Sequence, residues 1–262
     1  MSITAADVEA FHRDGILTVE SGIAPDVLDG ILADLDALPA ATRDEYLAGR
    51  IQDAWRHSRH IYAAATHQPI LAMLEKLYGA TPRPFQTLNF PRGTEQRAHA
   101  DSIHFNSEPF GMMCGVWLAL EDIGPDQGPL VYYPGSQHLA EINFEDIGVV
   151  PSYASYPHYE RYIETTISQH RFEPLHATIR KGQIVIWAAN VLHGGSLRRN
   201  KSLTRKSQVT HYYFAGCRYW RPGQSKRIRA YFEPDWIPHP SSAKRNPLKH
   251  FTWRVRNLVN RF

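Results

Sequence analysis

The sequence predicts a single domain of mainly β structure, a sandwich or barrel of short strands that is braced by helices near its N-terminus. After about residue 83, short runs rich in β-branched and aromatic residues alternate with Gly and Pro turns, as in sandwiches and barrels. Before residue 83, apolar residues recur at helical spacing. Helices confined to the front of such a chain are expected to pack on one sheet.

The helical brace is predicted to cover residues 1–82. Thr4 can cap a first helix together with Asp7, and Gly15 ends it. Pro25 fits the first turn of a second helix, because its missing N–H has no partner there. The elements predicted for this segment are helices at 4–14, 25–35 and 69–78 and a short strand at 16–19.

The β core is predicted to cover residues 83–215. Its predicted strands are short runs between turn residues, at 85–90, 103–105, 112–120, 130–133, 183–187 and 209–214. Residues 141–178, rich in Tyr and His, are predicted to be an irregular insertion that covers a pocket like a lid. Residues 216–262 are predicted to form a Pro-rich and then basic C-terminal tail.

The composition is that of a globular protein and excludes several other classes. With 43% hydrophobic and 21% charged residues, the chain is neither collagen-like nor a coiled coil. Its longest near-apolar run, 111–120, is too short for a transmembrane helix, and we expect no signal peptide. The two cysteines, Cys114 and Cys217, cannot form a disulfide framework, so a reducing, cytoplasmic location is predicted.

The positive net charge of +3 comes from the tail, since residues 244–262 carry six Lys and Arg and no acid. The rest of the chain is slightly acidic, so we expect no nucleic-acid partner. Apolar residues recur among the tail cations at three- and four-residue steps, which predicts a basic amphipathic helix. This helix either docks on the domain or on another subunit, or weakly contacts an anionic membrane surface. We expect the protein to be a monomer or a homodimer.

A candidate metal site is formed by His99, Asp101 and His193. If His99 and Asp101 lie two residues apart on a strand, their side chains point to the same side. His193, just after the apolar strand at 183–187, is placed to supply a second imidazole. Two His and one carboxylate leave coordination positions open, as in non-haem Fe(II) oxygenases, but they also suit a catalytic zinc in a hydrolase.

A second candidate feature is Arg205, which lies two residues before Ser207 at the start of the last predicted strand. Residues at this spacing share a face, so a guanidinium and a hydroxyl could converge on one carboxylate. Such a pair suits the far carboxylate of a dicarboxylic acid whose other end chelates the metal. The alternative is a surface arginine in a basic loop.

Taken together, these segments resemble the phytanoyl-CoA dioxygenase family of Fe(II)- and 2-oxoglutarate-dependent oxygenases. The similar segments follow in order along most of the chain, at residues 8–17, 93–101, 117–122, 128–138, 193–195 and 204–207. The sequence departs from the family at one point, since Gln137 is inserted into its Pro-Gly-Ser-His signature.

The resemblance implies a double-stranded β-helix, the cupin-like jelly roll, with helices packed on one sheet. It also implies site residues at matching positions. His99, Asp101 and His193 would bind Fe(II), and Arg205 with Ser207 would bind 2-oxoglutarate. The further pocket candidates are Trp117 for the cosubstrate, and Gln86, Thr87 and Asn89 for its inner end or the substrate.

The implied reaction consumes O2 and 2-oxoglutarate, releases succinate and CO2, and hydroxylates an unactivated C–H bond of a small molecule. Asp101 favours hydroxylation, because halogenating relatives have a small residue at that position. Two alternatives stay open, a non-redox, zinc-type hydrolase and a jelly-roll binding protein without catalysis. The substrate is not predicted, although the aromatic residues at 141–178 favour a polar or ring-bearing ligand.

Overall fold

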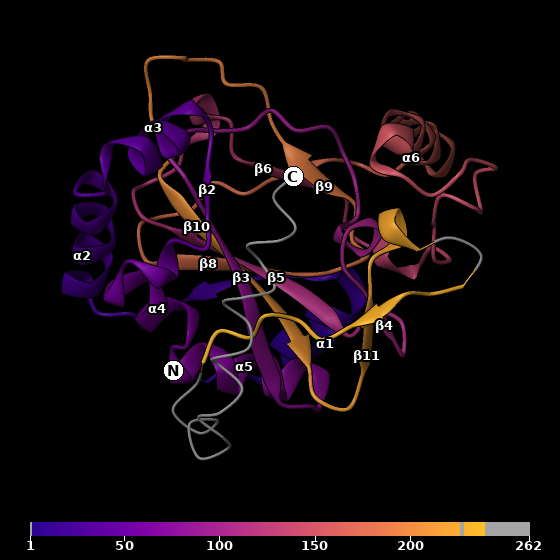
Figure 1. Ribbon diagram of the computed structural model, residues 1–262, viewed down its shortest axis with the longest axis horizontal. Helices are drawn as coiled ribbons and strands as arrows, with labels where there is room; N and C mark the ends of the chain where they lie inside the picture. The colour runs from indigo at the N-terminus through magenta and orange to yellow at the C-terminus, as the bar shows by residue number, and fades with distance from the viewer. Residues whose placement is uncertain (1, 226–227, 239–262) are drawn as a thin grey trace.

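A computed structural model describes residues 2–225 and 228–238 and shows one large antiparallel sheet with helices on one side (Figure 1). The strands of this sheet lie in the order β1-β8-β5-β10-β3-β2. Their bounds are β1 Ile16–Glu20, β8 Gln183–Ala188, β5 Met113–Ala119, β10 Ser207–Phe214, β3 Pro82–Phe90 and β2 Ile51–Gln52. Every neighbouring pair in the sheet is antiparallel.

Two small sheets complete the β structure. One has the order β7-β6-β9, with β7 at Leu175–His176, β6 at Leu130–Tyr132 and β9 at His193–Gly195. The other has the order β12-β11-β4, with β12 at Tyr231–Phe232, β11 at Arg218–Trp220 and β4 at Asn106–Glu108. Strand β6 packs through Leu130 on the large sheet. The two layers form the predicted jelly roll.

The large sheet is buried on both faces, and this explains its uninterrupted apolar strands. On β8, Ile184 and Ile186 pack on the helical side, whereas Val185 and Trp187 pack on the side of β6. Because successive side chains of a strand point to opposite faces, a strand covered on both sides needs apolar residues at every position. The apolar run at 112–120 has the same cause, since every residue of β5 is buried.

The helices on the outer face belong to the N-terminal brace, α1 Ala5–Asp14, α2 Pro25–Asp36, α3 Ala40–Ala48, α4 Arg59–Ala65 and α5 Gln68–Tyr78. The predicted capping box of α1 is confirmed, because Thr4 Oγ1 accepts from the Asp7 N–H at 3.1 Å and Asp7 Oδ2 accepts from the Thr4 N–H at 2.7 Å. Helices α3 and α4 were not predicted. The first buries only Tyr46, and the second has seven residues, so neither has a clear apolar period.

Several predicted elements need correction. Residues 103–105 are not a strand, since a 3-10 turn covers Asp101–Ile103 and β4 begins at Asn106. The insertion at 141–178 is not irregular, because it contains the helix α6, Tyr156–His170. The predicted strand at 16–19 is confirmed as β1, but β2 in the segment 1–82 and β11 and β12 in the predicted tail were not predicted.

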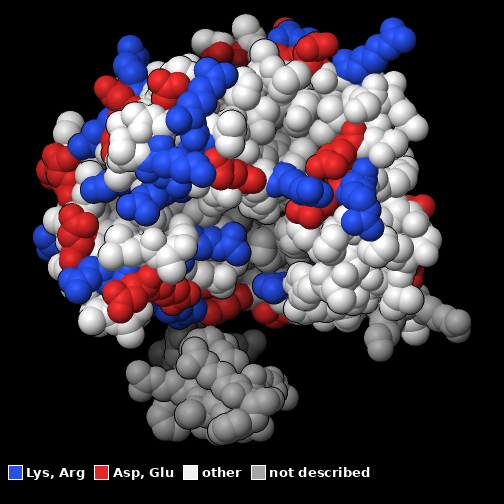
Figure 2. All heavy atoms as spheres, turned by 90° about the horizontal axis from the view of Figure 1, so that it is seen from above, with Lys and Arg blue, Asp and Glu red and all other residues white. Residues whose placement is uncertain are grey.

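The basic stretch at 244–262 lies outside the described residues, so its amphipathic helix stays a prediction. Among the residues that the structure describes, no helix has both the length and the apolar character needed to cross a membrane. Figure 2 shows one face of the molecule, on which acidic and basic side chains lie interspersed around a hollow near the middle.

Candidate active site

The three predicted metal ligands meet in a cavity of about 470 Å³ between the large sheet and the sheet of β6 and β9. The inner face of the large sheet supplies much of its wall, through Gln86, Leu88 and Phe90 of β3, Trp117 of β5, Trp187 of β8 and Val209 and His211 of β10. These positions are two residues apart on β3 and on β10, as expected for side chains on one face of a strand.

His99, Asp101 and His193 form a buried triad. Oδ1 of Asp101 lies 3.6 Å from Nε2 of His99 and 3.7 Å from Nε2 of His193. The two histidines face each other across an isolated β-bridge, in which each backbone N–H donates to the other's carbonyl oxygen at 2.9 Å. The expectation that His99 and Asp101 lie on one regular strand is wrong, because Asp101 begins the 3-10 turn. The bridge and the turn bring the three side chains together instead.

Backbone carbonyl groups fix the orientation of both imidazoles. Nδ1 of His99 lies 2.8 Å from the carbonyl oxygen of Arg97, and Nδ1 of His193 lies 3.0 Å from that of Val191. A carbonyl oxygen only accepts, so each Nδ1 carries the hydrogen and each Nε2 presents a lone pair towards Asp101. This is the tautomer that a metal ligand requires.

The protonation states of His193 and Asp101 also suit a cation. Burial lowers the pKa of His193 to about 4, so this imidazole is neutral at neutral pH. Burial opposes ionisation of Asp101, yet the surrounding His193, His211 and His99 hold its pKa well below the usual value. Two imidazoles and one carboxylate provide two nitrogen ligands and one oxygen ligand, whose atoms all lie within 4.8 Å of one another. This donor set fits Fe(II) or Zn²⁺.

Two residues beside the triad were missed by the sequence analysis. The indole Nε1 of Trp187 donates to Oδ2 of Asp101 at 2.8 Å, and Nε2 of His211 lies 3.6 Å from the same oxygen. Nδ1 of His211 in turn lies 2.9 Å from Oε1 of Gln86. The alternation of β10 gives a weak signal for His211, because it shares a strand face with Val209.

Arg205 lines the same cavity and is 4% exposed. Its guanidinium lies 5.2 Å from the centre of the Trp117 ring and 5.7 Å from that of Phe90. One guanidinium nitrogen, Nη2, makes a long hydrogen bond of 3.5 Å to the carbonyl oxygen of Arg92, and Nε has no partner in the described structure. Burial lowers the pKa of Arg205 only to about 10, so its guanidinium stays charged at neutral pH and can bind an anion.

The structure brings only some of the predicted pocket residues to this cavity. Trp117 and Gln86 line it, as predicted. Thr87 and Asn89 do not line it, because they alternate with Gln86 and Leu88 on β3. Ser207 does not line it either, and its Oγ lies 3.4 Å from the carbonyl oxygen of Arg205. These three side chains do not contact the cavity, so their role in binding the cosubstrate or the substrate stays a prediction.

The insertion at 141–178 contacts the site through tyrosines. Tyr153 and Tyr156 line the cavity, and the Tyr156 hydroxyl lies 3.3 Å from Nε2 of His104. The buried hydroxyl of Tyr159 accepts a hydrogen bond of 3.2 Å from the N–H of Ala100, the residue between two of the predicted metal ligands. Helix α6 is therefore part of the frame that holds the triad.

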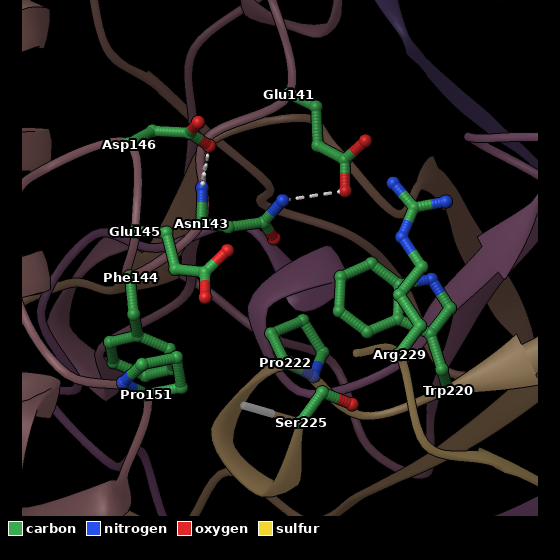
Figure 3. Close-up of a pocket in the computed structure, with 10 residues that line it drawn as sticks. All are labelled: Glu141, Asn143, Phe144, Glu145, Asp146, Pro151, Trp220, Pro222, Ser225 and Arg229. Carbon is green, nitrogen blue, oxygen red and sulfur yellow. Dashed lines mark hydrogen bonds between the residues drawn. The ribbon is translucent and has the colours of Figure 1, made fainter. Parts of the chain in front are cut away.

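A second cavity of about 300 Å³ contains none of the predicted site residues. Figure 3 shows its acidic side chains, with an amide hydrogen bond from Asn143 to Glu141 at 2.7 Å. It is lined by Glu141, Asn143, Phe144, Glu145, Asp146, Pro151, Trp220, Pro222, Ser225 and Arg229. The triad and Arg205 single out the larger cavity as the candidate active site.

Comparisons with known proteins agree with this site. The sequence model of the phytanoyl-CoA dioxygenase family matches residues 11–207. Phytanoyl-CoA dioxygenase domain-containing protein 1 from Mus musculus is 26% identical over 168 residues, 62% of this chain and 56% of the relative. The protein of the same name from Rattus norvegicus has the same identity and coverage. This chain thus spans about half the length of these curated relatives.

Solved structures with a similar fold include three enzymes or enzyme complexes. The non-heme alpha ketoglutarate dependent carbocyclase SnoK from nogalamycin biosynthesis has a TM-score of 0.67 and 15% identity, covering 88% of this chain and 95% of its own. The epimerase SnoN in complex with Fe3+, alpha ketoglutarate and nogalamycin RO has a TM-score of 0.67 and 20% identity, and the match covers 89% of this chain and 98% of SnoN. EctD from S. alaskensis with 2-oxoglutarate and 5-hydroxyectoine has a TM-score of 0.64 and 20% identity, and the match covers 94% of this chain and 89% of EctD.

Proposed function

This chain belongs to the phytanoyl-CoA dioxygenase family, and from that premise we propose that it is an Fe(II)- and 2-oxoglutarate-dependent oxygenase. Within that class, we propose that it hydroxylates an unactivated C–H bond of a small molecule. One observation carries the proposal. A buried His-Asp-His triad and a buried arginine, which has no acidic partner among the described residues, line the same cavity. A dicarboxylic acid that chelates a metal through one end would satisfy both.

The residues divide the work between them. Fe(II), 2-oxoglutarate and O2 supply the oxidising chemistry when they are bound, with succinate and CO2 as products. His99, Asp101 and His193 hold the metal and leave positions for other ligands. Arg205 binds the far carboxylate in a dry pocket between Trp117 and Phe90, where a charge-assisted hydrogen bond is strong.

Hydroxylation is the finer part of the proposal. Asp101 fills the position of the third protein ligand, which in halogenating relatives is left open by a small residue. The solved proteins of similar fold include a carbocyclase and an epimerase, and EctD was solved with 5-hydroxyectoine, so the fold itself does not determine the reaction. The carboxylate of Asp101 therefore favours hydroxylation over halogenation, but it does not distinguish hydroxylation from the other reactions.

The two alternatives leave observations unexplained. A zinc-type hydrolase would use the triad but gives no reason for a buried guanidinium in the same cavity. A binding protein without catalysis gives no reason for imidazoles whose Nε2 lone pairs converge on one carboxylate. The oxygenase explains both features.

The test is release of succinate by the full chain. The protein is reconstituted with Fe(II) without oxygen, mixed with 2-oxoglutarate, and exposed to air. We expect succinate that depends on Fe(II), and its loss in Asp101→Ala but not in Asp126→Ala, a change of an exposed aspartate. Equal succinate from Asp101→Ala, or none from the metal-loaded native protein with any candidate substrate, would contradict the proposal. Hydrolysis by the zinc-loaded protein would favour the hydrolase.

The setting of the protein is also a proposal. We propose a small-molecule substrate and no nucleic-acid partner, because the charges on the face in Figure 2 are mixed. We also propose that the protein is a monomer or homodimer in the cytoplasm. Its tail at 244–262 is either docked on the protein or in weak contact with a membrane surface. Chromatography of the intact and tail-deleted chains, with vesicle sedimentation, would distinguish these states.

A further inference from the structure

We propose that the substrate of this cavity carries an anionic group, a carboxylate or a phosphate, which Arg50 and Arg221 bind. The inference rests on the proposed function, because it names the class of substrate for the same site. Both arginines line the cavity that holds the triad. Neither has an acidic partner among the described residues, so both guanidinium groups are available to a ligand.

Arg221 lies close to the metal-binding end of the cavity. It directly follows β11 and is half-buried, with its guanidinium 5.1 Å from the ring centres of Phe105 and Phe232. The Phe105 ring is in turn 5.5 Å from the ring of His211, which neighbours Asp101. A substrate whose anionic group is bound to Arg221 could therefore extend to the triad.

The neighbouring Arg218 shows what is unusual about Arg221. Arg218 stands three residues earlier, on β11, and its guanidinium also contacts a ring, that of Tyr231, at 4.2 Å. However, Arg218 is exposed and donates to Oε2 of Glu108 at 2.6 Å. The fold thus supplies a carboxylate to the arginine that faces solvent and none, in the described structure, to the arginine that lines the cavity.

Arg50 supplies the second positive charge, from another part of the fold. It precedes the edge strand β2, beside β3, and is exposed to solvent. Its side chain nevertheless lines the cavity, together with that of Gln52 on β2. An anion between Arg50 and Arg221 would relieve the positive potential there.

The charge balance of the cavity leads to the same substrate class. Its lining residues include three arginines, Arg50, Arg205 and Arg221, and one carboxylate, Asp101. With 2-oxoglutarate and a divalent metal bound, dianion and cation cancel, and Asp101 balances Arg205. Two guanidinium charges are left over. A partly enclosed site with excess positive charge favours an anionic ligand over a neutral one of the same shape.

The side chains near these arginines indicate the rest of the substrate. Tyr153, Tyr156, His104 and Phe105 line the cavity on this side. The rings of His104 and Tyr153 are nearly parallel, at an interplanar angle of 19° and a centre distance of 6.5 Å, and Tyr153 is 52% exposed. Such surfaces bind flat or ring-bearing molecules by stacking. We therefore infer an anionic group attached to a flat, largely apolar body.

The experiment compares matched anionic and neutral probes. The full chain is loaded without oxygen with Mn(II) and saturating 2-oxoglutarate, and the binding of both is first measured by calorimetry. The complex is then titrated with 4-hydroxyphenylacetate against 4-hydroxyphenylacetamide, and with phenyl phosphate against phenol. We expect at least one anionic member to bind about tenfold or more tightly than its neutral partner. The preferred pair tells a carboxylate from a phosphate.

Variants then assign the preference to the two arginines. Arg221→Gln and Arg50→Gln should each reduce it severalfold and the double variant should abolish it, whereas Arg218→Gln should leave it unchanged. Equal binding of charged and neutral probes, no binding of any anionic probe, displacement of 2-oxoglutarate, or a preference that survives in the double variant would overturn the inference. Failure of the proposed function would appear earlier, as failure of the protein to bind Mn(II) and 2-oxoglutarate.

Discussion

The indole Nε1 of Trp187 donates a hydrogen bond of 2.8 Å to Oδ2 of Asp101 and leaves Oδ1 facing the two histidines of the triad. Gly115, the partner of Trp187 on the neighbouring strand, makes room for this indole. A Cβ atom at Gly115 would lie 2.2 Å from the ring. A glycine in the middle of a buried strand thus makes room for the indole that orients Asp101, a proposed metal ligand.

Trp187→Phe should weaken metal binding. The phenyl ring keeps most of the packing but cannot donate to Asp101, and loss of such a supporting hydrogen bond costs about 10- to 100-fold in metal affinity. Calorimetric titration of the metal-free protein with Mn(II) measures the change. Trp220→Phe is the matched control, because Trp220 is equally buried but its Nε1 has no partner among the described residues. Equal affinities in the two variants would show that the indole does not orient Asp101.

Tyr159→Phe should destabilise the segment between His99 and Asp101, the first two proposed metal ligands. Without the hydroxyl, the buried N–H of Ala100 loses its acceptor, which costs about 1–3 kcal/mol of unfolding free energy. Urea unfolding measures this loss, and metal affinity should fall with it. Tyr162→Phe, a change of an exposed residue on the same helix, should have little effect. A stability equal to that of the native protein would mean that α6 does not support the site.

The fold was largely predictable wherever burial leaves a pattern in the sequence. The apolar runs that became β5 and β8 face two cores, and the cap formed by Thr4 and Asp7 is local, so both could be recognised. Helix α6 was not predicted, because it buries only Tyr159, Ile163 and Thr166 and is otherwise polar. Its place in the structure depends on contacts with distant segments, which local patterns do not show.

The site was predictable as a set of residues but not as a geometry. The order of His99, Asp101 and His193 was enough to find the triad. The β-bridge that pairs the histidines joins residues 94 positions apart, and no local pattern indicates its register. Thr87 and Asn89 were named together with Gln86, although alternation along β3 allows only one set to face the cavity. Which set faces inward was decided by pairing with β10.

Acid should destabilise the metal-free protein through buried histidines. Burial lowers the pKa of His104 from 6.5 to about 4, so between these values the unfolded chain binds a proton that the folded chain does not. The free energy of unfolding therefore falls as the pH is lowered from 6.5 to 4, by up to about 1.4 kcal/mol per pH unit from this group. His193 contributes in the same window.

His104→Gln should remove one of these two contributions. Urea unfolding at pH 7, 6, 5 and 4.5 would show a shallower dependence on pH than in the native protein. His158→Gln, a change of an exposed histidine on α6, is the control and should leave the dependence as it is. Identical slopes in all three proteins would mean that the His104 imidazole is free to accept a proton in the folded state.

Arg205→Lys should separate the cosubstrate from the metal. Lysine can keep the charge but loses the planar fork, and a buried ammonium group loses its proton more readily than a guanidinium. Binding of 2-oxoglutarate to the Mn(II)-loaded protein should weaken by more than about tenfold, whereas Mn(II) affinity without 2-oxoglutarate should stay the same, since Arg205 is not a ligand. Arg199→Lys, in the exposed part of the same basic segment, should change neither value. If Arg205→Lys bound 2-oxoglutarate as tightly as the native protein, the carboxylate would have to lie elsewhere. The buried guanidinium between Trp117 and Phe90 would then need another anion.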